Sequence, residues 1–154
     1  MYWLGKFDES KSQIEIIVTK ILTNICLEYE LTKLKFKCKT LNNQTASKLL
    51  ELMPFKSTVS KWGKELYFDV PKNDIREEKS AKVLFNLGEI AFWNEGNAIA
   101  IGYGKTPTSI NDEIRLVSSG NLWAIACNPE ELYKLDDFDP EDQIVIRKLV
   151  KWKK

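Results

Sequence analysis

Residues 99–109, IAIGYGKTPTS, contain the Gly-Lys-Thr triplet with which many phosphate-binding loops end. Such a loop has the form GxxxxGK[ST], which requires a glycine at position 99, where this chain has Ile99. It also requires a helix that begins near the lysine, and Pro107 disfavours helical geometry in the residue before it. The segment is therefore expected to be the end of a strand that enters a loop, and not a nucleotide site.

The sequence contains no histidine. This removes the commonest general base, the usual partner of a nucleophilic serine or cysteine, and the commonest metal ligand. The acidic run at 136–142 lacks the glycine of a calcium-binding loop and is interrupted by Pro140. No metal or cofactor is expected. The three cysteines are far apart and lie among apolar residues, which favours buried thiols in a reducing compartment: Cys26, Cys38 and Cys127.

The composition is that of an ordinary globular domain, with 154 residues, 44% of them hydrophobic and 29% charged. Its 23 basic and 22 acidic residues leave a net charge of +1, which provides no overall field for nucleic acid or an anionic membrane. No apolar run approaches the ~20 residues that span a bilayer. The first residues lack the basic segment followed by an apolar segment that is typical of a signal peptide. We expect a cytoplasmic protein without nucleic-acid or membrane partners.

Alternating and helical patterns predict most of the elements. Residues 31–39 alternate apolar residues with lysines, as in a half-buried strand. Residues 43–53 have one apolar stripe, begin with asparagine and end before Pro54, which indicates a helix. Residues 59–71 are expected to form one long strand, with Trp62 in phase with the core residues Leu66 and Phe68.

The second half of the chain is dominated by short apolar segments separated by turns. We expect a hairpin around the turn at 94–97, two further strands at 114–119 and 121–127, a short helix after Asn128 and a final strand at 144–150. Many strands with two short helices are typical of a closed or nearly closed β-barrel.

The segment before the first predicted strand is ambiguous. Apolar residues between Ile14 and Ile25 recur at helical spacing, and Ser12 and Glu15 form a capping-box pattern. The many β-branched residues make a pair of strands over 13–29 the alternative. We expect residues 1–30 to be an N-terminal extension, helical and packed on the barrel or on a partner, and residues 31–154 to be the barrel domain.

Two segments, WGKELYFDVP and GEIAFWNEGNAIAIGYGKTPTS, resemble the patterns W-G-x-E-x-Y-F and G-K-T-P-x-S of a family of small prokaryotic cyclophilin-like proteins of unknown function. The resemblance covers about residues 31–150. It implies a mainly β fold, a closed eight-stranded barrel of cyclophilin type with two short helices, to which the N-terminal extension is added.

Peptidyl-prolyl isomerases of this fold donate a hydrogen bond from an arginine to the prolyl nitrogen. The arginines of this chain, Arg76, Arg115 and Arg147, lie outside the two segments, so no catalytic residue is assigned. We expect a module that binds a small molecule or an extended peptide in a groove lined by aromatic and polar residues of the two segments. The candidate lining residues are Glu65, Tyr67, Trp93, Asn94, Glu95, Asn97, Tyr103, Lys105 and Thr106.

Two alternatives remain open. One is a prolyl isomerase with an atypical site, in which Lys105 or Asn97 donates the hydrogen bond. The other is a subunit or interaction protein that uses residues 1–30 to contact a partner or a second copy of itself, because the apolar residues of that segment must be buried somewhere.

Overall fold

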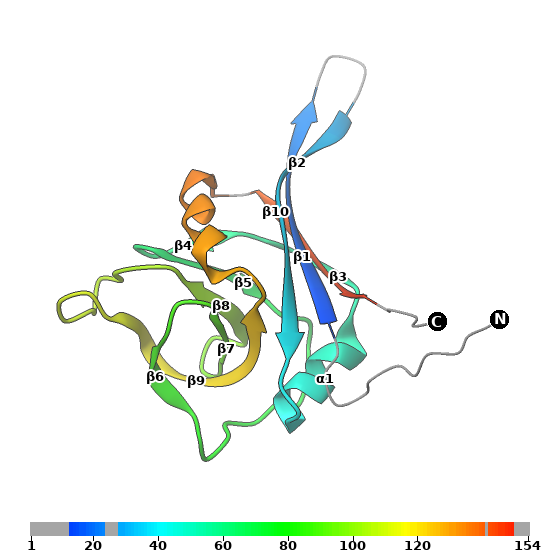
Figure 1. The fold of residues 1–154 in the computed structure, drawn as a ribbon. Helices are drawn as coiled ribbons and strands as arrows, with labels where there is room; N and C mark the ends of the chain where they lie inside the picture. Colours follow the sequence, from blue (N-terminus) through cyan, green and yellow to red (C-terminus); the bar gives the residue numbers. More distant parts are fainter. Residues whose placement is uncertain (1–12, 24–27, 141, 150–154) are drawn as a thin grey trace.

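The computed structural model describes residues 13–23, 28–140 and 142–149 (Figure 1). These residues form ten strands, one α-helix and one 3-10 helix, labelled η1. In chain order the elements are β1 (Gln13–Thr23), β2 (Glu28–Thr40), α1 (Gln44–Leu52), β3 (Phe55–Thr58), β4 (Ser60–Lys61), β5 (Glu65–Asp69), β6 (Lys82–Phe85), β7 (Glu89–Trp93), β8 (Ala98–Gly102), β9 (Ile114–Ala126), η1 (Pro129–Asp137) and β10 (Gln143–Leu149).

All ten strands belong to one antiparallel sheet with the order β3-β10-β1-β2-β9-β7-β8-β5-β4, and β6 pairs with β9 beside this path. The two ends of the path, β3 and β4, are separated in the chain by one residue, Val59, which is buried in the core. Its backbone N–H donates to the carbonyl of Asp142 at 2.8 Å. The sheet therefore curls into a nearly closed barrel, with α1 and η1 at opposite ends (Figure 1).

The fold class is confirmed, with ten strands among the described residues where eight were expected. Part of the difference comes from the segment 59–71, expected as one strand. It is a hairpin of β4 and β5, because Gly63 adopts a φ of +61° and Trp62 and Glu65 exchange backbone hydrogen bonds of 2.9 and 3.2 Å. The strands expected at 114–119 and 121–127 are, in contrast, one continuous strand, β9.

The helix expected between Ile14 and Ile25 is wrong, and the strand alternative is correct for the described residues. Strand β1 lies between β10 and β2 in the sheet, and β2 continues across residue 30. Among residues 13–18 of β1, the alternate positions Ile14, Ile16 and Val18 are fully buried. The β-branched side chains suit a pleated strand better than a helix. The barrel itself thus covers these apolar residues, while Ile25 and residues 1–12 lie outside the described part.

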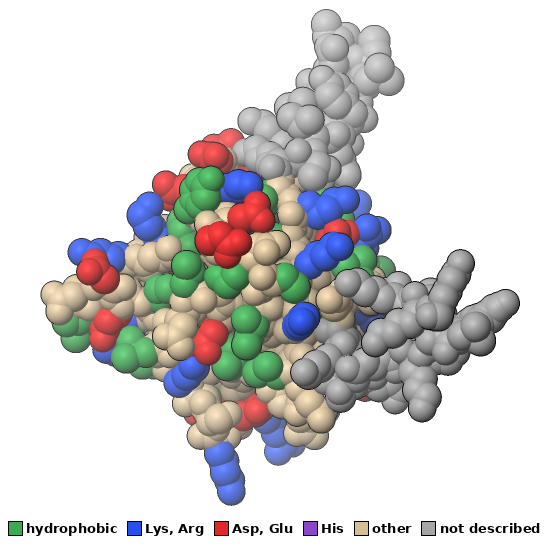
Figure 2. Space-filling model, viewed as in Figure 1, with side chains coloured by type: hydrophobic (Ala, Val, Ile, Leu, Met, Phe, Trp, Pro, Cys, Tyr) green, Lys and Arg blue, Asp and Glu red, His purple; other side chains and the backbone are tan. Residues whose placement is uncertain are grey.

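The other local predictions are confirmed where the structure describes them. Strand β2 buries Cys38 and exposes Lys35, Lys37 and Lys39. Helix α1 begins after Asn43, whose side chain accepts from the N–H of Ala46 at 2.9 Å. Cys127 differs from expectation, because it is exposed just beyond the end of β9. No helix among the described residues is long and apolar enough to cross a membrane. Acidic and basic side chains are interspersed on the face shown in Figure 2.

Candidate functional site

A pocket with a volume of about 160 Å³ lies on the sheet face opposite the main core. Strand β5 positions two of its lining residues, because its alternation places Leu66 and Phe68 in the core and turns Glu65 and Tyr67 to the other face. The turn after β4 and strands β7 and β9 supply the neighbouring walls. The lining residues are Trp62, Glu65, Tyr67, Trp93, Leu116 and Val117.

The aromatic walls of the pocket are held in place by their neighbours. The rings of Tyr67 and Trp93 pack edge to face, with centroids 6.1 Å apart and planes at 82°. The indole N–H of Trp93 donates to Oγ of Ser118 at 2.6 Å. Gly96 lies against the same indole so closely that a Cβ there would be 2.1 Å from its six-membered ring. The pocket is therefore largely formed before any ligand enters.

Glu65 is the one acidic residue that lines the pocket, and only 5% of it is exposed. Its Oε1 atom is buried and has no hydrogen-bond partner among the described residues. Burial disfavours the charged form and raises the pKa of Glu65 from 4.5 to about 7. The basic side chains on neighbouring segments bind elsewhere, since Lys64 pairs with Asp136 and Arg115 with Glu113. The carboxyl group is thus a buried acceptor that nothing in the described chain neutralises.

A family model described as cyclophilin-like matches residues 23–147. The chain belongs to the cyclophilin-like family. A solution structure of a hypothetical protein from Archaeoglobus fulgidus is similar to it, with a TM-score of 0.66 and 24% sequence identity over 97% of this chain and all of that one. This likeness shows the shared fold. Among curated proteins, none matches the chain.

Of the expected lining residues, three meet in the pocket of this cyclophilin-like protein: Glu65, Tyr67 and Trp93. Trp62 joins them, although its phase predicted a place in the core. The turn at Gly63 changes which face Trp62 occupies relative to β5. Ser60 pairs with Tyr67 across the hairpin, and the same register places Trp62 opposite Glu65. Cross-strand partners share a face of the sheet, so Trp62 lies on the face of Glu65. A glycine between two strand-like segments was the signal in the sequence that could have placed Trp62 correctly.

Three of the expected residues lie in the β7–β8 turn and do not line the pocket. Asn94 donates to Oδ1 of the buried Asn121 at 3.0 Å. Asn97 has a positive φ of 49° and donates to the carbonyl of Val70 at 2.9 Å. Glu95 is exposed at the tip of the turn. The two asparagines therefore shape and anchor the hairpin that carries Trp93.

The remaining three expected residues lie in the segment after β8 and also do not line the pocket. The hydroxyl of Tyr103 donates to Asp136 at 3.1 Å, in the direction of η1. Lys105 is exposed, and the buried Thr106 donates from its N–H to Oγ of Ser109 and from its hydroxyl to the carbonyl of Arg115 on β9. The backbone of Lys105 is nevertheless tied to the pocket, because its carbonyl accepts from the N–H of Lys64 at 2.8 Å. The Gly-Lys-Thr-Pro loop thus supports the turn between Trp62 and Glu65.

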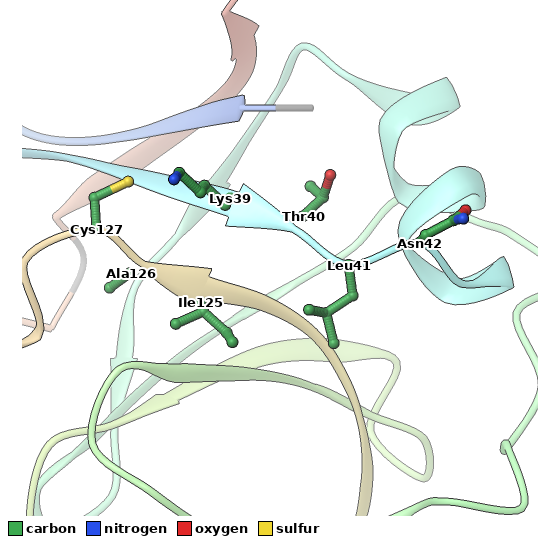
Figure 3. Close-up of a pocket in the computed structure, with 7 residues that line it drawn as sticks. All are labelled: Lys39, Thr40, Leu41, Asn42, Ile125, Ala126 and Cys127. Carbon is green, nitrogen blue, oxygen red and sulfur yellow. The ribbon is translucent and has the colours of Figure 1, made fainter. Parts of the chain in front are cut away.

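A larger cavity of about 590 Å³ lies along the ends of β2 and β9. Its lining residues follow the two strands side by side (Figure 3), and they are Lys39, Thr40, Leu41, Asn42, Ile125, Ala126 and Cys127. No buried, unpartnered polar side-chain atom lines it within the described chain, so volume alone distinguishes it. The described residues also contain no cluster of three or more Cys, Asp or Glu side chains that could hold a metal ion.

The substitution Gly96→Ala is expected to disturb the pocket through Trp93. The new Cβ would overlap the indole ring, so either the ring or the turn must move. We expect a loss of stability of about 1–3 kcal/mol, with an altered environment of the Trp93 indole N–H. Chemical denaturation with indole N–H NMR measures both effects. An unchanged Trp93 signal would contradict the packing described above, and Glu95→Ala in the same turn is the control.

Proposed function

We propose that this cyclophilin-like protein is a binding module whose site is the pocket around Glu65. The ligand is a small molecule or a single side chain of an extended peptide. The observation that carries the proposal is the buried carboxyl group of Glu65, whose Oε1 lacks a partner in a cavity walled by aromatic side chains. Ligand sites are typically apolar hollows with a few convergent polar groups, and this pocket has that composition.

Energetic considerations support a ligand at this position. A buried polar atom without a hydrogen bond costs about 1–3 kcal/mol, and such groups are rare in folded proteins. A carboxyl group with a strongly raised pKa in a hollow is a typical feature of functional sites. A ligand that donates a hydrogen bond to Glu65 would satisfy the oxygen that the described residues leave unpaired.

The placement of the arginines favours binding over prolyl isomerisation. Arg115 makes two hydrogen bonds to Glu113, and Arg147 binds Glu15 at 2.6 Å. Arg76 lines a small cavity beside α1. None of these side chains lines the pocket, and the side-chain donor of Asn97 is engaged in its turn. An isomerase with an atypical site is the second candidate, and a subunit or interaction protein that uses residues 1–30 remains a prediction of the sequence.

The proposal is tested by two-dimensional NMR with a panel of small-molecule fragments and proline-containing peptides. We expect ligands to shift the indole N–H signals of Trp62 and Trp93 and the amide of Glu65. Trp123, which is fully buried in the main core, is the internal control and should not move. New cis/trans exchange on a bound peptide would support the isomerase instead. Shifts confined to the cavity at the ends of β2 and β9 would contradict both.

A further inference from the structure

We infer that the pocket around Glu65 selects a primary alkylammonium group, carried by a free amine or by a lysine side chain. This inference rests on the proposed function and specifies its ligand class. Three features of the pocket lead to it: a buried acceptor without a donor, aromatic walls, and the absence of basic residues among the lining side chains.

The buried carboxyl oxygen of Glu65 determines which chemical groups can bind. Oε1 of Glu65 needs a hydrogen-bond donor, and an ammonium group carries three donors and no acceptor. A hydrogen bond between an ammonium and a carboxylate is charge-assisted and is roughly twice as strong as a neutral one. A quaternary ammonium has no N–H and would leave the oxygen unpaired. An anion would meet a carboxyl group and no lysine or arginine in the lining.

The walls fit the rest of such a ligand. Trp62, Tyr67 and Trp93 provide aromatic rings, which attract cations through their electron-rich faces. Leu116 and Val117 provide apolar surface for a short alkyl chain. A single water needs on the order of 10–15 Å³ of such space, so a pocket of about 160 Å³ admits a group of several non-hydrogen atoms.

No lysine of the described chain fills this role. Lys64, next to Glu65 in the sequence, binds Asp136 at 3.2 Å, and Lys82 on β6 binds Glu89 on β7 at 2.9 Å. Lys61 on β4 donates to the carbonyl of Asp136 at 2.8 Å. These three lysines therefore have other partners, and the Glu65 carboxyl group is left to an external cation.

Ammonium binding should depend on pH, because it requires the carboxylate form of Glu65. With a pKa of about 7, roughly a tenth of the free pocket is ionised at pH 6 and nine tenths at pH 8, so affinity should rise about tenfold. Burial alone causes the raised pKa.

The other titratable or charged groups on the turn and the strands around the pocket are Lys61, Lys64, Tyr67, Asp69, Lys82, Glu89 and Arg115, and strand β8 carries none.

The test compares four probes by their effect on the Trp62 and Trp93 indole signals at pH 6 and pH 8. Butylamine supplies charge, N–H donors and a chain; 1-butanol lacks the charge; tetramethylammonium lacks the N–H; N-acetyl-lysine-N-methylamide presents the same group on a peptide. We expect the two primary ammonium probes to bind about tenfold more tightly at pH 8 than at pH 6. They should also bind at least about tenfold more tightly than the other two.

The variant Glu65→Gln should remove this preference and its pH dependence, whereas Asp69→Asn, an exposed residue on the same strand, should retain both. Binding by the lysine amide alone would support a peptide lysine as the source, and binding by butylamine alone a free amine. Equal binding of butylamine and 1-butanol would overturn the inference and leave the pocket as a ligand site. If none of the four probes shifts the Trp62 and Trp93 indole signals, the inference is overturned too. The panel of fragments and peptides described under the proposed function then decides whether that function also fails.

Discussion

The substitution Glu65→Gln is expected to stabilise the protein at pH 8 by about 3 kcal/mol. The pKa of Glu65 is about 7 in the folded protein, against an ordinary glutamate value of 4.5, which applies to the unfolded chain. Between these values the folded state binds a proton that the unfolded state has released, so the free energy of unfolding falls as pH rises. The stability is fully present below pH 4.5 and is lost as the pH passes through 7. Glutamine does not ionise and avoids this loss.

Urea denaturation of both proteins at pH 5 and pH 8 measures the effect. The difference between the variant and the parent should widen by roughly 2.5 kcal/mol over this interval, because part of the loss has already occurred at pH 5. Asp69→Asn, which removes an exposed carboxyl group from the same strand, should give no comparable change. A difference that is constant with pH would show that Glu65 titrates alike in the folded and unfolded chain.

The substitution Asn121→Leu is expected to destabilise the protein by about 4 kcal/mol. Asn121 is completely buried and makes four hydrogen bonds. It donates to Oγ1 of Thr45 at 3.0 Å and to the carbonyl of Arg76 at 2.9 Å. It accepts from the N–H of Glu78 and from Nδ2 of Asn94, both at 3.0 Å. Leucine would leave several of these buried partners unpaired, at about 1–3 kcal/mol each.

Thermal and urea denaturation measure this loss. Asn42→Leu, at an exposed asparagine just before α1, is the matched control and should change stability by less than about 0.5 kcal/mol. Because Asn94 belongs to the turn that carries Trp93, the Asn121 variant should also broaden or shift the Trp93 indole signal. A stability loss below that of an ordinary surface substitution would mean that the hydrogen bonds of Asn121 do not hold the segment of Arg76 and Glu78, Thr45 and Asn94 together.

Elements with a strong local signal were predictable from the sequence. The lysine alternation of β2 and the asparagine cap of α1 act over a few residues, so the sequence alone predicts both elements. For β1 the sequence leaves helix and strand as alternatives, because its apolar residues satisfy helical and alternating patterns at once. Its position between β10 and β2 decides the matter, and that position depends on residues more than a hundred places away in the chain.

The pocket was partly predictable, because strand alternation is a local signal. Glu65 and Tyr67 share a face by simple alternation, and Trp93 ends a strand of the predicted hairpin, so the pattern places all three among the candidate lining residues. Trp62 was misplaced, because a single positive φ at Gly63 turns an apparent strand into a hairpin. The partners of Asn121 were not foreseeable, since Thr45 is 76 residues away in the sequence. Periodicity carries no information about hydrogen bonds over such separations.

The carboxyl group of Glu65 is a buried acceptor, and in the proposed function it receives a ligand. A carbon-13 NMR titration of this carboxyl group, with and without butylamine, measures both its burial and its contact with the cation. We expect an apparent pKa near 7 in the free protein and a lower value with butylamine present, because a bound cation favours the carboxylate. A pKa near 4.5 that butylamine leaves unchanged would contradict both the burial of the group and its role in binding.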